Sequence, residues 1–538
     1  MKSVWWIHLL GLAACACAGG MLPSGDCKPT NPPVDAGTPD AGTPDAGGST
    51  RLTREQLMDP DACKDCHPKH YEEWAGSMHA YAADDPVFLA MNKRGQRETN
   101  GELGDFCVKC HAPMAVRTGA TTDGLNLADV PQKLKGVTCF FCHTVNGVEQ
   151  GHQSNNPLTL ANDDVMRGPF NDPYVSSAHY AGYSELHHRD RLASATLCGT
   201  CHDIVNGHGT HIERTFAEWK ESVFSQPNVG ITCGQCHMDQ SVELEPVANV
   251  PGAPLRRNHS HLFPAVDNAV TPFPDEAATQ RLIAANQRFL NATLRSALCV
   301  HGFPGQAHVF VVLDNSNNGH AFPSGASQDR RVWVEIEAFS GAQRIYSSGV
   351  LQNDRQPVTD LLATDPDLWL MRDRLFDDQG DEVHDFWAGT CYESLQLPAQ
   401  QTFSISDPRF YQSHVMKRYP NGLGGRLFLS GFPDRVRMRV RLSPIGQDVL
   451  QELIASGDLT DMRARDNTVV YDVGTPLEWT AATVTERFAD SQGIPVSCIS
   501  KTALLGADPK TLAAAKSTCA PAANGGDGTV GSASRTIP

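Results

Sequence analysis

The sequence predicts a multidomain α+β protein, in which a unit of short helices and loops is followed by a unit of antiparallel strands. The first observation behind this class is a five-residue pattern, Cys-x-x-Cys-His, that occurs five times between residues 63 and 237. The second is a series of short segments after residue 300 in which apolar and polar residues alternate, as in half-buried strands. The chain of 538 residues has room for roughly two to four domains.

The first 50 residues carry signals for export and tethering. Residues 1–14 combine a lysine with an apolar run too short to span a bilayer, which is typical of a signal peptide. The sequence Leu-Ala-Ala-Cys that ends at Cys15 resembles a bacterial lipobox and predicts a lipid anchor that binds the membrane surface. Residues 15–50 repeat the unit DAGTP and are expected to form a disordered Pro/Gly/Asp tether. We therefore expect an outer-membrane lipoprotein that faces the periplasm or the cell surface; cleavage near Ala18, giving a soluble periplasmic protein, is the alternative.

The five repeats have the spacing that covalent haem attachment requires. Two thiols two residues apart can add to the two vinyl groups of one haem, and the histidine that follows can then bind the iron. A zinc interpretation needs paired Cys-x-x-Cys units and does not explain a histidine after every second cysteine. The repeats therefore predict five covalently bound haem c groups. The predicted attachment residues are Cys63, Cys66, Cys107, Cys110, Cys139, Cys142, Cys198, Cys201, Cys233 and Cys236, and the predicted proximal ligands are His67, His111, His143, His202 and His237.

The segments around the repeats resemble a known family. The similarity lies in CKDCHPKHYEEWAGSMHA, FCVKCHAPMA, GVTCFFCH, LCGTCHD and FAEWKESVF…ITCGQCHM. These segments are similar to multihaem c-type cytochromes related to the tetrahaem cytochrome c of nitrifying bacteria. The resemblance covers about 200 residues and implies a mostly helical and loop-rich pentahaem cytochrome c domain over residues 51–265. Because that family holds electron carriers as well as enzymes, the resemblance leaves the activity open.

The distal ligand of each iron, opposite the motif histidine, is expected to come from the histidines outside the repeats. His79 lies in a Trp-x-x-Ser-x-His segment that matches the family, and His320 lies in a Gly-His-x-x-Pro-Ser-Gly segment that resembles a loop of its relatives. A second Glu-Trp-x-x-Ser segment has Phe224 where the first has His79, so only the first copy is expected to supply a ligand.

Two further distal ligands are expected from the stretches beside the later repeats. They are His179, with His187 and His188 as substitutes, and His261, which resembles the family's returning distal histidine and has His259 as its rival. A fifth distal ligand remains open among His152, His208 and His211. We expect mostly bis-histidine, low-potential haems.

Residues 266–490 contain no repeat and are predicted to form a β-sandwich-like domain. The segment 435–442 alternates strictly, and an amphipathic helix over 274–298 is expected to come first. The other expected strands are 308–313, 331–339, 344–351, 426–429, 468–473 and 480–487, with a helix at 445–456. The expected role of this domain is to cover the haems and to supply His320.

Four cysteines outside the repeats and beyond the tether suit disulfides in an exported protein. Three connectivities are possible, and the short separation of Cys498 and Cys519 favours that pair, which leaves Cys299 with Cys391. Residues 491–538 are expected to form a partly disordered C-terminal tail.

Charge and cofactor together favour electron transfer. The formal net charge is −17, which argues against nucleic acid and favours docking to basic patches on redox partner proteins, such as other cytochromes or reductases. The main hypothesis is an exported pentahaem cytochrome that passes electrons through stacked haems. The alternative is an oxidoreductase with one open haem that acts on a small nitrogen or sulfur compound; a third hypothesis makes the β-rich half a binding or adhesion module.

Overall fold

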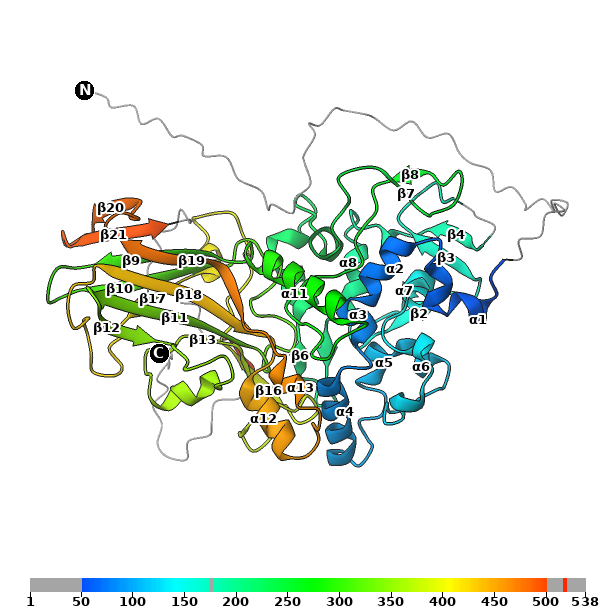
Figure 1. Cartoon of the computed structure of the whole chain (residues 1–538), viewed down its shortest axis with the longest axis horizontal. Coiled ribbons are helices and arrows are strands. Elements are labelled where there is room, and N and C mark those ends of the chain that lie inside the picture. Colours follow the sequence, from blue (N-terminus) through cyan, green and yellow to red (C-terminus); the bar gives the residue numbers. More distant parts are fainter. Residues whose placement is uncertain (1–50, 175–177, 501–515, 520–538) are drawn as a thin grey trace, which may run out of the picture.

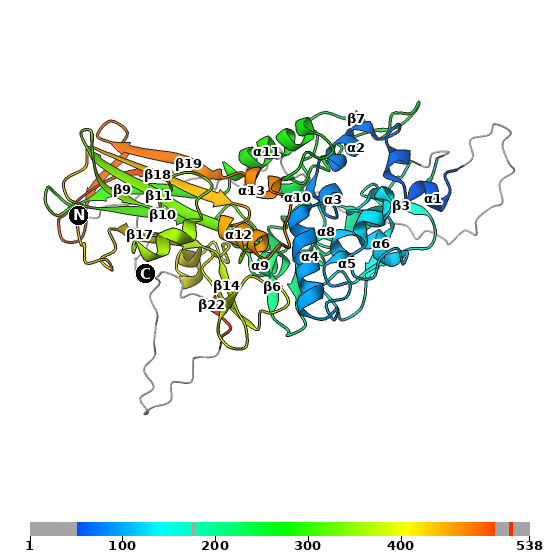
Figure 2. The ribbon, with the colours of Figure 1, turned by 60° about the horizontal axis from the view of Figure 1, so that its bottom comes forward.

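The computed structural model describes residues 51–174, 178–500 and 516–519, which form a helical, loop-rich half and a β-rich half (Figure 1). Two views show these halves side by side along the longest axis (Figures 1 and 2). The predicted mixed class with antiparallel sheets is confirmed. The expected signal peptide, the lipid anchor at Cys15 and the tether lie outside the described residues, as do residues 520–538 of the expected tail. Within the described ranges, no helix is both long enough and apolar enough to cross a membrane.

The first half consists of short helices connected by loops and small two-stranded sheets. Two of the haem-motif helices begin at a threonine whose side chain accepts a backbone N–H, which satisfies an otherwise unpaired donor: Thr138 and Thr232. The helices are α1 (Arg54–Leu57), α2 (Pro68–Ala75), α3 (Met78–Tyr81), α4 (Pro86–Glu98), α5 (Val108–His111), α6 (Pro113–Arg117), α7 (Cys139–Thr144), α8 (Ser194–Gly199), α9 (Thr215–Glu221) and α10 (Cys233–His237). The paired strands are β1 (Val145–Val148) with β2 (Leu158–Leu160), β3 (Val165–Gly168) with β4 (Tyr180–Tyr183), β5 (Ile204–Val205) with β6 (His211–Glu213), and β7 (Glu245–Pro246) with β8 (Leu255–Arg256).

The second half is built on two five-stranded antiparallel sheets that share one apolar core. One sheet has the order β17-β10-β9-β21-β20 and the other β12-β11-β18-β19, to which β13 adds at β11. Buried residues of both sheets, such as Val311 and Leu442, belong to the same core cluster, as in a β-sandwich. The strands are β9 (Arg295–His301), β10 (His308–Asp314), β11 (Arg331–Ser340), β12 (Gln343–Ser348), β13 (Leu370–Met371), β17 (His414–Tyr419), β18 (Arg435–Ser443), β19 (Tyr471–Thr480), β20 (Glu486–Ala489) and β21 (Pro495–Ser500).

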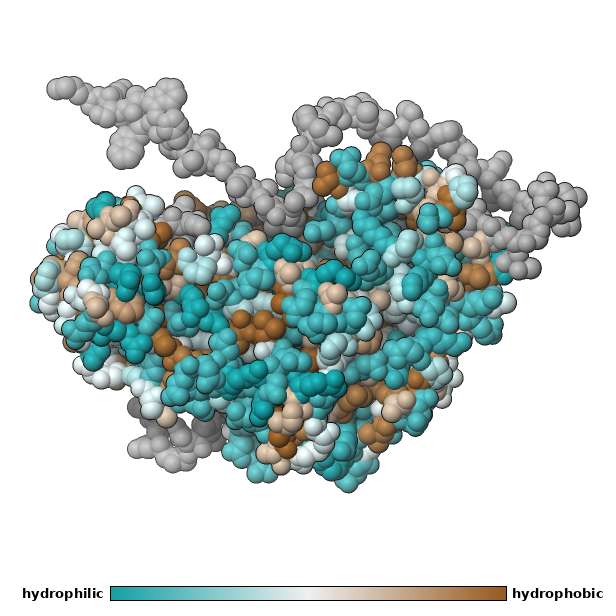
Figure 3. All heavy atoms as spheres, viewed as in Figure 1, coloured by the Kyte–Doolittle hydropathy of each residue, from teal (hydrophilic) through white to brown (hydrophobic). Residues whose placement is uncertain are grey.

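Helices and a smaller sheet lie between the sandwich and the helical half. The helices are α11 (Glu276–Leu290), α12 (Gln447–Ala455) and α13 (Arg463–Asp466) (Figure 1). The smaller sheet has the order β15-β14-β16-β22, formed by β15 (Glu382–Val383), β14 (Asp373–Phe376), β16 (Cys391–Ser394) and β22 (Lys516–Ser517). The strand pair β14–β16 faces the haem-motif half through Asp373, whose carboxylate accepts a 2.7 Å bond from Arg214. The face seen in Figure 3 is mostly hydrophilic, as suits a surface in water.

Several sequence-based boundaries are corrected by the structure. The helix expected over 274–298 ends at Leu290, and its last residues belong to β9, because this strand pairs with β10 and β21 in the centre of a sheet. The segment 426–429 forms no strand, and β20 begins at Glu486, six residues after the start of the expected strand. Strands β21 and β22 come from the stretch that the sequence assigned to a C-terminal tail.

The disulfide pairing predicted from loop length is wrong. The structure pairs Cys299 with Cys498 and Cys391 with Cys519. Cys299 and Cys498 lie opposite each other on β9 and β21, and strand pairing brings them together although 199 residues separate them. Cys391 belongs to β16, which pairs with β22, and Cys519 follows β22 after one residue. Sheet register therefore decides the connectivity.

Candidate multihaem site

All 19 predicted haem residues line one cavity of about 1880 Å³. The ten motif cysteines, the five motif histidines and the four named distal candidates all contribute, although they come from segments as far apart as Cys63 and His320. Apolar side chains such as Phe141, Leu197 and Ile231 share the lining. Thiols for covalent attachment, imidazoles for iron and an apolar wall are what haem c requires, so the residues present fit this group.

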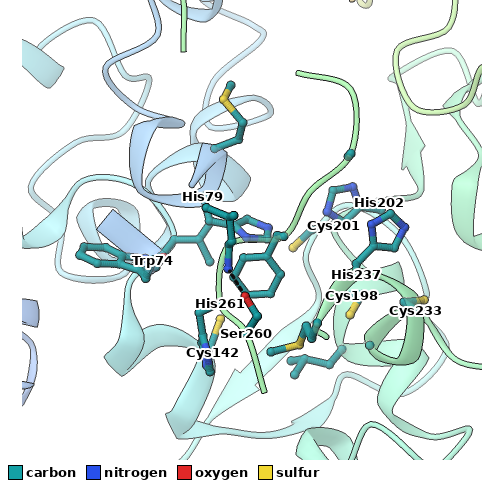
Figure 4. Close-up of a pocket in the computed structure, with 18 of the residues that line it drawn as sticks. Trp74, His79, Cys142, Cys198, Cys201, His202, Cys233, His237, Ser260 and His261 are labelled. Atoms are coloured by element: carbon teal, nitrogen blue, oxygen red, sulfur yellow. Dashed lines mark hydrogen bonds between the residues drawn. The ribbon is translucent and has the colours of Figure 1, made fainter. Parts of the chain in front are cut away.

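Four motif histidines face a second histidine at nearly the same separation. Two imidazoles that bind one iron from opposite faces each have a nitrogen about 2 Å from the metal, so that their ring centroids lie on the order of 6 Å apart. The observed centroid separations are 6.3 Å for His67–His179, 6.2 Å for His143–His261, 6.3 Å for His202–His79 and 6.4 Å for His237–His320. Figure 4 shows His79, His202, His237 and His261 projecting into the pocket. The four named candidates thus lie where distal ligands would lie.

Hydrogen bonds to Nδ1 orient most of these rings. His67, His111, His143 and His237 each have Nδ1 within 2.5–3.0 Å of a backbone carbonyl oxygen, those of Val247, Ala82, Arg167 and Pro264. On the distal side, Nδ1 of His179, His261 and His320 lies 2.8–3.0 Å from the carbonyls of Tyr180, His259 and Ala321. A proton held at Nδ1 leaves Nε2 unprotonated, and Nε2 is then the nitrogen available to a metal.

Burial favours the neutral form, which metals bind, in those facing histidines whose pKa is shifted. Burial lowers the pKa of His79 to about 3 and the pKa values of His202 and His237 to about 4. The pKa values of the other faced histidines that show a shift, such as His261 and His320, are also lowered, with burial as the main cause. A ligand that need not lose a proton binds metal more readily near neutral pH.

His111 is the exception among the motif histidines. Its ring stacks on Phe88 of α4, with centroids 4.0 Å apart and planes 4° apart. Within residues 51–174 and 178–500, no second imidazole stands at the separation found for the other four. The three candidates for a fifth distal ligand, His152, His208 and His211, do not line the cavity.

Three further histidines line the cavity without facing a motif histidine as the four pairs do. His187, proposed as a substitute for His179, lies 5.6 Å from His143, but its Nε2 is 2.8 Å from the carbonyl oxygen of Cys142. His70 was not singled out by the sequence, and its ring packs edge-on against His261 at 4.9 Å. Its place in α2, three residues after the motif histidine His67, is the signal that the sequence offers. His259, the rival of His261, also lines the cavity, and its carbonyl accepts from the His261 ring.

Thiols of different repeats lie in contact with one another. Contacts join Cys63 to Cys139, Cys110 to Cys201 and Cys198 to Cys233. The first repeat is therefore next to the third, and the fourth is next to both the second and the fifth. Cys142 of the third repeat also lies within electrostatic range of the fourth.

The comparisons with known proteins agree with this site. A family model described as cytochrome c554 and c-prime matches residues 62–144, the stretch with the first three repeats. Among solved structures, the chain is similar to a penta-haem cytochrome c552 from Thermochromatium tepidum, with a TM-score of 0.53 and 18% identity over 79% of this chain and 99% of that chain. No curated protein sequence matches. Together they support a multihaem c-type cytochrome; a link to the tetrahaem proteins of nitrifying bacteria stays a prediction.

Proposed function

We propose that the chain is an exported pentahaem c-type cytochrome that transfers electrons to or from a redox partner. The observation that carries this proposal is the set of four facing histidine pairs in a cavity lined by ten motif cysteines. Haem iron held between two histidines exchanges single electrons with little need for a substrate at the metal. The chain's own contribution is to hold these ligands, to exclude water and to bring the groups close together.

The thiol contacts support an order for the electron path. The first, third, fourth and fifth repeats follow one another in space, and the second repeat joins at the fourth. We infer a path with one branch, in which the branch carries His111. The end at the fifth repeat lies against the β-rich half, because His320 belongs to that half.

A haem count with electron paramagnetic resonance tests the proposal. A pyridine haemochrome assay should give five haems per chain, and the oxidised protein should show low-spin ferric signals from four of them. A count well below five, or high-spin signals from most haems, would contradict it.

A second candidate function rests on the His111 position. With no second histidine facing it among the described residues, the iron there is expected to be five-coordinate, which would suit an oxidoreductase acting on a small nitrogen or sulfur compound. The test is a titration of the reduced protein with carbon monoxide, a general ligand of open ferrous haem. Uptake of one molecule per chain supports an open site. No uptake would reject the oxidoreductase and leave electron transfer as the single proposed function.

The proposed location is the membrane surface, through a lipid at Cys15. A Cys15→Ser variant should move from the membrane fraction to the soluble fraction while its haem count remains unchanged. A wild-type protein found only in the soluble periplasmic fraction would contradict the anchor and favour the cleaved, soluble form.

A further inference from the structure

The Glu-Trp-x-x-Ser segment, which occurs twice in the sequence, makes the same local contact in both copies. The first copy runs from Glu73 to Ser77 at the end of α2, and the second from Glu218 to Ser222 at the end of α9. In each copy the serine hydroxyl donates a 2.7 Å bond to the carbonyl of the tryptophan three residues before it. The same serine hydrogen bond therefore follows both helices.

The two tryptophans hold the segments that lead into two haem-motif helices. Trp74 Nε1 donates a 2.8 Å bond to the carbonyl of Val137, and Trp219 Nε1 donates a 2.9 Å bond to the carbonyl of Ile231. Each carbonyl lies two residues before the first cysteine of a repeat. The helices that follow, α7 and α10, carry the proximal histidines of the third and fifth repeats.

The two glutamates bind the loops that carry the distal candidates His261 and His320. Glu73 Oε2 accepts a 2.9 Å bond from the backbone N–H of His261. Glu218 Oε2 accepts a 3.2 Å bond from the N–H of Ala321, next to His320, and a 2.6 Å bond from the hydroxyl of Ser324. Since His261 faces His143 and His320 faces His237, each Glu-Trp pair contacts both sides of one facing pair.

A cation four residues earlier accompanies each glutamate. Lys69 precedes Glu73, and Arg214 precedes Glu218 at 3.7 Å. Burial raises the pKa of both carboxyls, and in each case the nearby cation opposes this shift.

We propose that Glu73-Trp74 and Glu218-Trp219 form a duplicated ligand clamp, in which the glutamate positions the distal histidine and the tryptophan positions the segment of the proximal histidine. The clamp acts on His143–His261 in the first copy and on His237–His320 in the second. Neighbouring residues on a helix point about 100° apart, which lets one dipeptide reach two sides of a site. This inference rests on the proposed bis-histidine cytochrome. The glutamates are positioning residues, since they contact loops and not iron.

The test compares alanine variants of the two glutamates with variants of the ligands themselves. In the full-length holoprotein, Glu73→Ala and Glu218→Ala should each convert a fraction of one low-spin haem to high spin, and each should let the reduced protein bind up to one additional carbon monoxide per chain. Glu73→Gln and Glu218→Gln keep an acceptor oxygen and should retain most of the low-spin signal. Glu72→Ala and Glu221→Ala are the matched controls, because these glutamates lie on the same helices and are exposed.

The outcomes separate the clamp from the proposed function. If His261→Ala and His320→Ala each open one haem but the glutamate variants do not, the clamp is wrong and the cytochrome proposal stands. If the histidine variants open no haem, the bis-histidine proposal is itself wrong. Should the alanine variants fail to fold, Ser324→Ala removes one of the two loop bonds to Glu218 and should still raise carbon monoxide binding at one haem; no rise would overturn the clamp.

Discussion

Phe88 and His111 lie ring against ring, with centroids 4.0 Å apart, whereas every other motif histidine faces an imidazole. Phe88 belongs to α4, and Asp85, the N-cap of this helix, accepts a 3.0 Å bond at its carboxylate from the backbone N–H of Val87. The Asp85 cap stabilises the first turn of α4, and Phe88 belongs to that turn. The environment of His111 is thus set by packing and by its Nδ1 contact with Ala82.

Removal of the Phe88 ring should take away the stacking partner that restricts the orientation of the His111 ring. We expect Phe88→Ala to lower the free energy of unfolding by about 3 kcal/mol, as for other buried aromatic truncations, and to alter the high-spin spectrum of one haem. Denaturant unfolding and electron paramagnetic resonance measure the two effects. Trp333→Ala, at a buried aromatic residue of β11 that does not line the cavity, is the control: it should destabilise comparably and leave that spectrum unchanged.

Replacement of His79 by methionine should change one haem, the one at His202. The two rings face each other at 6.3 Å, and a methionine ligand in place of histidine raises the reduction potential of a haem. We therefore expect His79→Met to shift one of the five midpoint potentials upward in a spectroelectrochemical titration. His152→Met, at an exposed histidine, should shift none; an unchanged set of potentials in His79→Met would refute this pairing.

The disulfide between Cys391 and Cys519 should stabilise the β14–β16–β22 sheet. It joins β16 to Cys519, which lies just beyond β22, and such cross-links typically contribute about 2–4 kcal/mol. We expect the Cys391→Ser/Cys519→Ser double variant to unfold at a lower temperature and to be cleaved faster near residue 516. Peptide mapping without reduction checks the connectivity, and a peptide that links Cys498 to Cys519 would contradict the structure.

Glu213 should make stability depend on pH. It lines the cavity, and burial raises its pKa from 4.5 to about 7. A carboxyl whose pKa is higher in the folded protein favours folding when protonated, so its contribution is present below pH 4.5 and is lost as the pH rises towards 7. Glu213→Gln should flatten the pH dependence of the unfolding free energy in this window by an amount on the order of 3 kcal/mol.

The control for this dependence is Glu221→Gln at an exposed position, which should leave the profile unchanged. An identical slope between pH 4.5 and 7 in Glu213→Gln and in the parent protein would show that Glu213 does not titrate there.

The sequence by itself determined the local chemistry. Haem attachment needs two thiols and one histidine within five consecutive residues, so the repeats predict the cofactor without knowledge of the fold. The short segments around four other histidines predict distal ligands: His79, His179, His261 and His320. The alternation of residues 435–442 predicts a strand, and β18 spans Arg435–Ser443.

Only the tertiary structure decided which groups meet. His79 follows the first repeat but faces His202 of the fourth, because a distal ligand approaches iron from the other side and comes from any segment that packs there. Cys299 meets Cys498 because β9 pairs with β21. The position opposite His111 likewise depends on packing among distant segments, and periodicity and spacing along one chain carry no information about such contacts.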